Sequence, residues 1–299
     1  MAHRLSLYLF ITSWLLILVP AILFSIFVLT HLHWIFSIFT AILLFLSCKF
    51  LLLVYFTNPG FIPLNSAPQP QIQEQQQPLT SPTSPDPAYT LENLPSHYPF
   101  VQQQPLYLQT RTVYLGQTPV ECKYCATCQS WRPPRTSHCM FCNRCVLKHD
   151  HHCPWTGTCI GYRNYRFFYF FILFTWLLLA YVLSILIYFL VREASFHENV
   201  SAALNQQVIP LILVVYTFLM GMIALLIYML GWSLFGLTCY HSYLIGVHTT
   251  TNEYIKRKFS NDGNPYDQGC LRNYYTTLFQ RRDDSQLDFK TWEALPSPV

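Results

Sequence analysis

Residues 125–159 read CATCQSWRPPRTSHCMFCNRCVLKHDHHCPWTGTC. With Cys122 just before it, this block holds eight of the eleven cysteines in the 299-residue chain, together with four histidines. Cysteines two residues apart reach one tetrahedral ion from a tight turn, and a distant cysteine or histidine completes the shell. The spacing therefore predicts two zinc ions held by eight of these twelve side chains. We expect Cys122 and His149 to be additional side chains near the metal cluster.

The run Asp150-His151-His152-Cys153 indicates a second role for side chains that the metal ions leave over. Spacing alone does not say which cysteines and histidines these are. Pro154 favours an extended backbone at Cys153, so we expect this thiol on a turn rather than in a helix. A neighbouring imidazole can accept the thiol proton, and Asp150 can orient that imidazole. The run thus predicts a cysteine nucleophile.

The composition indicates a membrane protein, because 52% of the residues are hydrophobic and only 11% are charged. A soluble domain averages about 25% charged residues. A helix needs roughly 20 mostly apolar residues to cross a bilayer. Four windows meet this condition, and the first is too long for a cleaved signal peptide. They are residues 5–30, 34–56, 167–191 and 208–237.

The basic residues predict how these spans are oriented. Of 18 lysines and arginines, eight lie between residues 57 and 166 and seven follow residue 237. By the positive-inside rule both termini and the long middle loop are cytoplasmic. In that reducing compartment clustered cysteines favour metal binding over disulfides. Asn199-Val200-Ser201 is a glycosylation acceptor in a predicted lumenal loop at 192–207.

The predicted fold class is an all-α integral membrane protein with four transmembrane helices and a small cytoplasmic zinc domain between the second and third. Residues 57–110 hold 11 of the 20 prolines and ten glutamines, which is typical of a flexible linker. We expect five parts: helices one and two at 1–56, the linker at 57–110, the cysteine-rich domain at 111–166, helices three and four at 167–240, and a cytoplasmic C-terminal region at 241–299.

Basic residues of the cysteine-rich block favour a phosphate-bearing acyl donor. These residues are Arg132, Arg135 and Lys148. A basic zinc module also suits nucleic acid, but a tether between two membrane spans argues against a duplex in the nucleus. We therefore expect no nucleic-acid partner.

The segment from Cys125 to Phe168 resembles the DHHC cysteine-rich domain of the protein S-acyltransferases, the palmitoyltransferases. Four spans with this domain between the second and third are similar to that family's layout. The chain departs from the family pattern at Asn58, where aspartate is usual, and at Thr156-Gly157-Thr158, where asparagine is favoured before the next cysteine. Two later motifs also match: Thr250-Thr251-Asn252-Glu253 is similar to the family's TTxE, and Asn264-Pro265-Tyr266 with Gly269 and Asn273 to its C-terminal motif.

The resemblance implies a role for each side chain of the block. It implies one zinc ion held by Cys125, Cys128, His138 and Cys145, and a second held by Cys139, Cys142, His152 and Cys159. It leaves Asp150, His151 and Cys153 as the catalytic group.

The implied reaction moves a long-chain acyl group, in the form of palmitoyl, from acyl-coenzyme A to cysteines of membrane-associated proteins. Cys153 would carry the acyl group between the two, with His151 accepting its proton and Asp150 steering that imidazole. We expect Arg132 and Arg135 to bind the phosphates of the coenzyme, and Thr251 to form a hydrogen bond near Asp150.

Two further motifs resemble the branch of the family that acylates Ras-type small GTPases. They are the run Arg132-Pro133-Pro134-Arg135 and the step Asn164-Tyr165-Arg166. This resemblance implies GTPase substrates and a small accessory subunit, and we expect residence in the endoplasmic reticulum or Golgi.

Two alternatives compete with the enzyme. One is a catalytically inactive membrane scaffold that uses the zinc module only to bind partners. The other is a membrane-anchored ubiquitin ligase with a cross-braced zinc module. Both explain the zinc ligands, but neither gives a reason for the thiol of Cys153.

Overall fold

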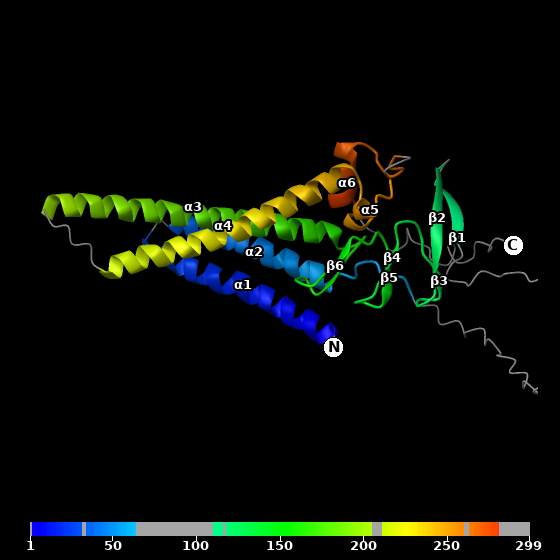
Figure 1. Cartoon of the computed structure of the whole chain (residues 1–299), viewed down its shortest axis with the longest axis horizontal. Helices are drawn as coiled ribbons and strands as arrows, with labels where there is room; N and C mark the ends of the chain where they lie inside the picture. Colours follow the sequence, from blue (N-terminus) through cyan, green and yellow to red (C-terminus); the bar gives the residue numbers. More distant parts are fainter. Residues whose placement is uncertain are drawn as a thin grey trace, which may run out of the picture.

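The computed structural model describes residues 2–31, 34–63, 110–115, 118–204, 211–259 and 263–280. The long helices lie side by side, and the short strands and small helices gather beyond one end of them (Figure 1). The long helices are α1 (Ala2–His31), α2 (Trp34–Phe56), α3 (Tyr165–Leu204) and α4 (Leu211–Gly246). Each contains a stretch long and apolar enough to cross a membrane, namely Leu7–Ile26, Trp34–Phe56, Tyr165–Arg192 and Thr217–Gly246. The four expected spans are confirmed at this level.

Helices α3 and α4 extend beyond the windows that hydropathy selects. Helix α3 continues to Leu204, so Asn199 lies in a helix and not in the expected loop at 192–207. Helix α4 continues through His241 to Gly246. A hydropathy window marks only the apolar part of a helix, whereas backbone hydrogen bonding can continue through the polar residues that follow.

The helix bundle buries a few polar groups between neighbouring helices. Ser47 of α2 and Thr175 of α3 are both buried, and their hydroxyl oxygens lie 2.6 Å apart in a hydrogen bond. Such pairing is expected where no water can satisfy a hydroxyl. Many outward side chains of the helices are large and apolar, as at Leu16, Phe45 and Phe218, and these faces suit contact with lipid.

The expectation of an all-α protein is wrong for the cysteine-rich domain, which contains seven short strands. They form a three-stranded antiparallel sheet, β1-β2-β3, and two hairpins, β4-β5 and β6-β7. Each hairpin pairs a histidine with a cysteine across its strands, His138 with Cys145 and His152 with Cys159. Metal ligands that face each other across two strands need an extended backbone. The strands are β1 (Thr110–Leu115), β2 (Thr118–Cys125), β3 (Ser130–Trp131), β4 (Ser137–Cys139), β5 (Arg144–Val146), β6 (His151–Cys153) and β7 (Thr158–Ile160).

The chain after α2 joins the bundle to the cysteine-rich domain. Residues 57–63, the start of the predicted linker, pack on β5, where the Ile62 amide donates to the Cys145 carbonyl at 2.9 Å. A side chain at Gly161 would meet the Pro59 carbonyl at 2.6 Å, so only glycine permits this approach. Residues 64–109, most of the predicted linker, lie outside the described residues.

The buried side chain of Asn164 stabilises the same junction between the helix bundle and the cysteine-rich domain. Its side-chain amide donates to the carbonyls of Val54 in α2 and Cys159 in β7, and its oxygen accepts from the Gly161 amide. This one side chain therefore links α2, β7 and the start of α3. Two small helices, α5 (Thr251–Ile255) and α6 (Cys270–Leu278), follow α4 and lie at the same end of the bundle.

Candidate active site and metal centres

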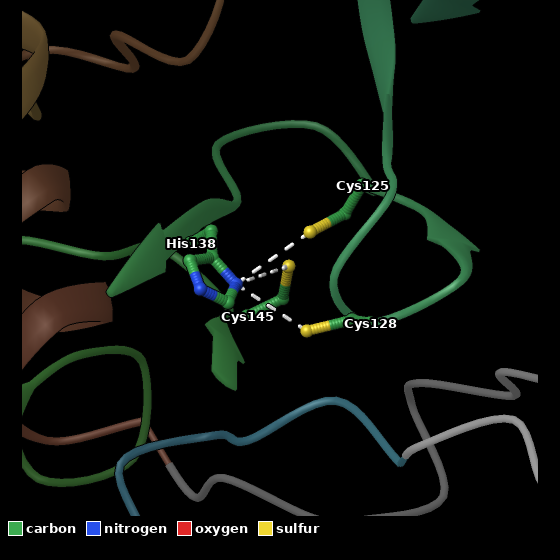
Figure 2. Close-up of side chains that lie close together, drawn as sticks. All are labelled: Cys125, Cys128, His138 and Cys145. Carbon is green, nitrogen blue, oxygen red and sulfur yellow. Dashed lines mark hydrogen bonds between the residues drawn. The ribbon is translucent and has the colours of Figure 1, made fainter. Parts of the chain in front are cut away.

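The first cluster of metal-ligating side chains joins the β2-β3 turn to the β4-β5 hairpin. Figure 2 shows three cysteines and one histidine pointing toward one centre. The His138 Nδ1 atom lies 3.3 to 3.8 Å from the three sulfurs, and a tetrahedral zinc ion would require nitrogen–sulfur edges of about 3.6 Å. The members of this cluster are Cys125, Cys128, His138 and Cys145, and the geometry fits a zinc ion.

The second cluster lies where the β4-β5 and β6-β7 hairpins meet. Nδ1 of His152 is 3.4 Å from the Cys142 sulfur and 3.6 Å from the Cys159 sulfur. The members are Cys139, Cys142, His152 and Cys159. Three thiolates and one imidazole make a closed, four-ligand shell, which is typical of a structural site. Both clusters have the composition that the resemblance implied.

Asp150 and His151 form a pair at the start of β6, in which the carboxylate is buried and the imidazole is 30% exposed. Nδ1 of His151 lies 2.7 Å from one carboxylate oxygen of Asp150. The other oxygen accepts a hydrogen bond of 2.8 Å from the backbone amide of Thr251, at the first residue of α5. Asp150 is therefore held from two sides, by its neighbour in sequence and by a residue 101 positions later. The expected contact of Thr251 with Asp150 is present, and the donor is the main chain.

Cys153 ends β6 and lies above the interior of the helix bundle. Its backbone is extended and Pro154 begins the following turn, as the sequence predicts. The side chain is 6% exposed and belongs to an apolar cluster that includes Val54, Phe168 and Ile172 of α2 and α3. The side chain therefore packs against apolar side chains of the helix bundle.

The three side chains shift one another's protonation. Burial alone would raise the pKa of the Asp150 carboxyl, but the hydrogen bond and charge of His151 lower it. Burial alone would lower the pKa of His151, but hydrogen bonding to Asp150 and Cys153 raises it to about 9. Burial alone would raise the pKa of the Cys153 thiol, but His151 lowers it. Within the group the carboxylate therefore favours the imidazolium form of His151, and the imidazolium favours the thiolate form of Cys153.

A buried ion pair holds α5 in place beside Asp150. Two guanidinium nitrogens of Arg135 lie 2.8 and 2.6 Å from the Glu253 carboxylate, and Arg135 also donates to the His248 carbonyl. The plane of the guanidinium lies 4.4 Å over the Tyr266 ring. Glu253 accepts from the Thr250 amide in a capping box at the start of α5. The pair thus connects the strands to the C-terminal segment.

A basic cavity of about 830 Å³ separates β2 from the residues that follow α5. Its lining includes Arg132 and Arg135, which the sequence predicts to bind phosphate, and Lys123, Lys256 and Lys258. Because Arg135 is already bound to Glu253, Arg132 and the lysines are the cations available to a ligand there. Binding of phosphate by the two arginines remains a prediction.

Comparison with known proteins identifies the family. A family model described as DHHC palmitoyltransferase matches residues 119–258, which include both clusters and the Asp150–Cys153 run. Probable protein S-acyltransferase 1 of Arabidopsis thaliana is 32% identical over 280 residues, covering 91% of this chain and 75% of that protein. The chain belongs to the DHHC palmitoyltransferase family.

Two further relatives are similar over most of this chain. Protein S-acyltransferase 8 of Arabidopsis thaliana is 34% identical over 289 residues, covering 93% of this chain and 65% of the relative. Palmitoyltransferase ZDHHC18 of Mus musculus is 33% identical over 273 residues, covering 88% of this chain and 64% of the relative. In both matches the chain spans less than two thirds of the relative's length. The resemblance to DHHC palmitoyltransferases is confirmed, and assignment to the Ras-acylating branch stays a prediction.

One buried side chain of the site was missed by the sequence analysis. His241 of α4 is 2% exposed, and the centre of its ring lies 6.1 Å from that of His151. The expected span at 208–237 ends four residues before His241, whereas the apolar stretch of α4 continues to Gly246 and includes it. A titratable residue inside an apolar span is a functional candidate, so a longer window would have found this one.

Proposed function

We propose that the chain is a protein-cysteine S-acyltransferase that moves a long-chain acyl group, palmitoyl in the first instance, from acyl-coenzyme A to cysteines of membrane-associated proteins. One observation carries the proposal. The Cys153 thiol, activated by His151 and Asp150, lies against the apolar interior of four membrane-spanning helices. A soluble headgroup can stay in water there while its acyl chain enters the bundle, where each buried CH2 contributes about 0.8 kcal/mol.

The first step forms an acyl-enzyme. The Cys153 thiolate attacks the thioester carbonyl carbon, and the bond from that carbon to the coenzyme sulfur breaks. The departing coenzyme thiolate takes the proton of the His151 imidazolium, and the Asp150 carboxylate stabilises the imidazolium until then. The products of the step are acyl-Cys153, neutral His151 and the free thiol of coenzyme A.

The second step returns the site to its starting state. The thiol of the protein substrate gives its proton to neutral His151 and attacks the acyl carbon. Cys153 leaves as a thiolate, so the thiolate–imidazolium pair forms again. Each step exchanges one thioester for another, and a cysteine is both a good nucleophile and a good leaving group for this exchange.

The two metal clusters brace the loop that carries these residues. In the proposed enzyme each cluster holds a zinc ion with four protein ligands, and such a closed site cross-links the hairpins. The phosphates of coenzyme A lie in the basic cavity, where Arg132 and the neighbouring lysines bind them and Arg135, already paired with Glu253, forms part of the lining.

The proposal includes the membrane in which the protein resides and the orientation of its domains. The distribution of basic residues supports a cytoplasmic zinc domain and cytoplasmic termini in a multi-pass protein of the endoplasmic reticulum or Golgi. In Figure 1 the start of α1, the end of α2, the start of α3 and the end of α4 all face the cysteine-rich domain, which agrees with this topology. The resemblance to the Ras-acylating branch supports Ras-type GTPases as substrates and a small accessory subunit as partner.

The experiment that tests the function is incubation of the purified full chain with labelled palmitoyl-coenzyme A. We expect a label that hydroxylamine removes, that is absent in Cys153→Ser and that remains in the control Cys239→Ser, an exposed cysteine of α4. Labelling that persists in Cys153→Ser, or no labelling of the native chain, would favour the inactive scaffold instead.

A further inference from the structure

The buried imidazole of His241 lies beside the catalytic one, and neither metal cluster uses it. The ring is tilted by 40° to the His151 ring at a centre-to-centre distance of 6.1 Å. Both imidazoles meet the same phenyl ring of Phe168 edge-on, His151 at 5.2 Å and His241 at 5.1 Å. These three rings, contributed by β6, α3 and α4, therefore form one packed group behind the thiol.

A hydrogen bond fixes the position of the His241 ring. Its Nδ1 atom lies 3.0 Å from the hydroxyl of Tyr165, the first residue of α3, and both side chains are buried. A hydroxyl without this partner would be costly in an apolar surrounding. Tyr165 thus determines where the ring lies between α3 and α4.

The contribution of His241 to His151 is contact. The rings of His151, His241 and Phe168 pack at centre-to-centre distances of 5.1 to 6.1 Å, and this packing limits rotation of the catalytic ring.

We propose that His241 is a positioning residue for His151: held by Tyr165, it completes with Phe168 a socket that keeps the catalytic ring aligned with Asp150 on one side and Cys153 on the other. The inference rests on the proposed function of Cys153 and His151. It adds an α4 residue to a site that the DHHC run alone does not define.

Two variants and one matched control test the inference. Tyr165→Phe removes the hydroxyl that holds the ring, and His241→Ala removes the ring. The control, Tyr169→Phe, removes a second α3–α4 hydrogen bond, because the Tyr169 hydroxyl lies 3.0 Å from that of Ser242 about one turn further along α3. Each protein is compared for its melting temperature, the alkylation rate of Cys153 by iodoacetamide at pH 7, and the kcat and KM of acyl transfer.

We expect kcat to fall roughly tenfold in His241→Ala and severalfold in Tyr165→Phe, as for a misaligned general base, with the KM for palmitoyl-coenzyme A unchanged. Alkylation of Cys153 falls in parallel in both variants and keeps its native rate in Tyr169→Phe. Equal losses in Tyr165→Phe and Tyr169→Phe would overturn the inference, since general helix packing would then explain both. If His241→Ala does not fold, the two tyrosine variants still settle the question.

The alkylation measurement separates this inference from the proposed function. It reports on the thiol and its imidazole whether or not any acyl group is transferred. Slower alkylation in Tyr165→Phe alone, in a chain that forms no acyl-enzyme, would support the positioning role and contradict the acyltransferase. Native alkylation and native kcat in both variants would overturn the positioning role alone.

Discussion

The chemistry of the site depends on one carboxylate that is almost inaccessible to water. Asp150 is 2% exposed and interacts through both of its oxygens. Its negative charge raises the pKa of His151, and the resulting imidazolium lowers the pKa of Cys153. The reactivity of the thiol therefore depends on a residue that does not touch it.

Replacing Asp150 should shift the titration of the thiol. In Asp150→Asn the imidazolium loses its negative partner, so the pKa of His151 falls from about 9 and that of Cys153 rises. Thiolate formation then moves to higher pH, and we expect alkylation of Cys153 at pH 7 to fall at least roughly tenfold and to recover as the pH rises. The measurement is the alkylation rate between pH 6 and 10, with Asp267→Asn as a control on an exposed carboxylate. A profile that does not move would contradict the role of Asp150.

At this scale the spacing and the resemblance contribute different parts of the prediction. The contiguous Asp150–Cys153 run predicts a cysteine nucleophile, and the paired cysteines predict two zinc ions. The resemblance implies which side chains hold which ion, and it also implies the contact of Thr251 with Asp150 that the structure contains. The ring of His241 is absent from these predictions, because it reaches the site only through the packing of α4 against α3.

Among the helices and strands, the site depends on the position of the short helix α5. Five residues long, it depends on its capping box and on the ion pair between Glu253 and Arg135. Both side chains are almost fully buried, at 5% and 7% exposure. Breaking a buried ion pair by removing one partner leaves an uncompensated charge.

The variant Glu253→Gln tests this dependence. It leaves the Arg135 guanidinium without a carboxylate, and we expect a loss of about 3–5 kcal/mol in the free energy of unfolding. Acyl-enzyme formation should fall with it, because α5 no longer presents the Thr251 amide to Asp150. Thermal unfolding and labelling with palmitoyl-coenzyme A measure the two effects. The control is Glu121→Gln, an exposed acidic residue of β2, and equal stability of both variants would contradict the prediction.

The β4-β5 hairpin supplies ligands to both metal clusters and therefore couples them. His138 and Cys145 belong to the first cluster, and Cys139 and Cys142 belong to the second. We expect Cys145→Ser to retain fewer than two zinc ions per chain and to weaken the second site as well as the first. The control Cys122→Ser changes a buried cysteine outside both clusters and should retain two ions. The measurement is the zinc content of each protein by elemental analysis. Two zinc ions per chain in Cys145→Ser would contradict the assignment of Cys145 as a zinc ligand.

Helices could be predicted from the sequence better than strands. Long apolar windows identify four helices with little ambiguity. The strands of the cysteine-rich domain are two to eight residues long, and most are too short for an alternating pattern to be recognised. The register of these strands follows from metal ligation and from contacts with residues 57–63. A scale of strand propensity for single residues includes neither effect.

For the whole molecule, β6, which carries Cys153, lies with the other strands of the cysteine-rich domain and the C-terminal helices at one end of the bundle (Figure 1). The proposed orientation puts that end in the cytoplasm and the α3–α4 connection in the lumen. A glycosylation acceptor introduced at 205–210 should therefore be modified, and one introduced at 70–100 should not. The native acceptor Asn199 lies seven residues beyond the predicted span end at Arg192, about 10 Å along the helix. Endoglycosidase-sensitive mass shifts report the result, and the reverse pattern would contradict the orientation.

The amide that Thr251 directs at Asp150 has a genetic consequence. A premature stop codon just after α4 would leave the DHHC run, all eight cysteine and histidine ligands and every membrane-crossing helix intact. A survey that counts motifs would score such an allele as functional, although its aspartate would lack one of its two anchors. We therefore expect truncating variants that end before residue 251 to lose activity, as substitutions of Asp150 do.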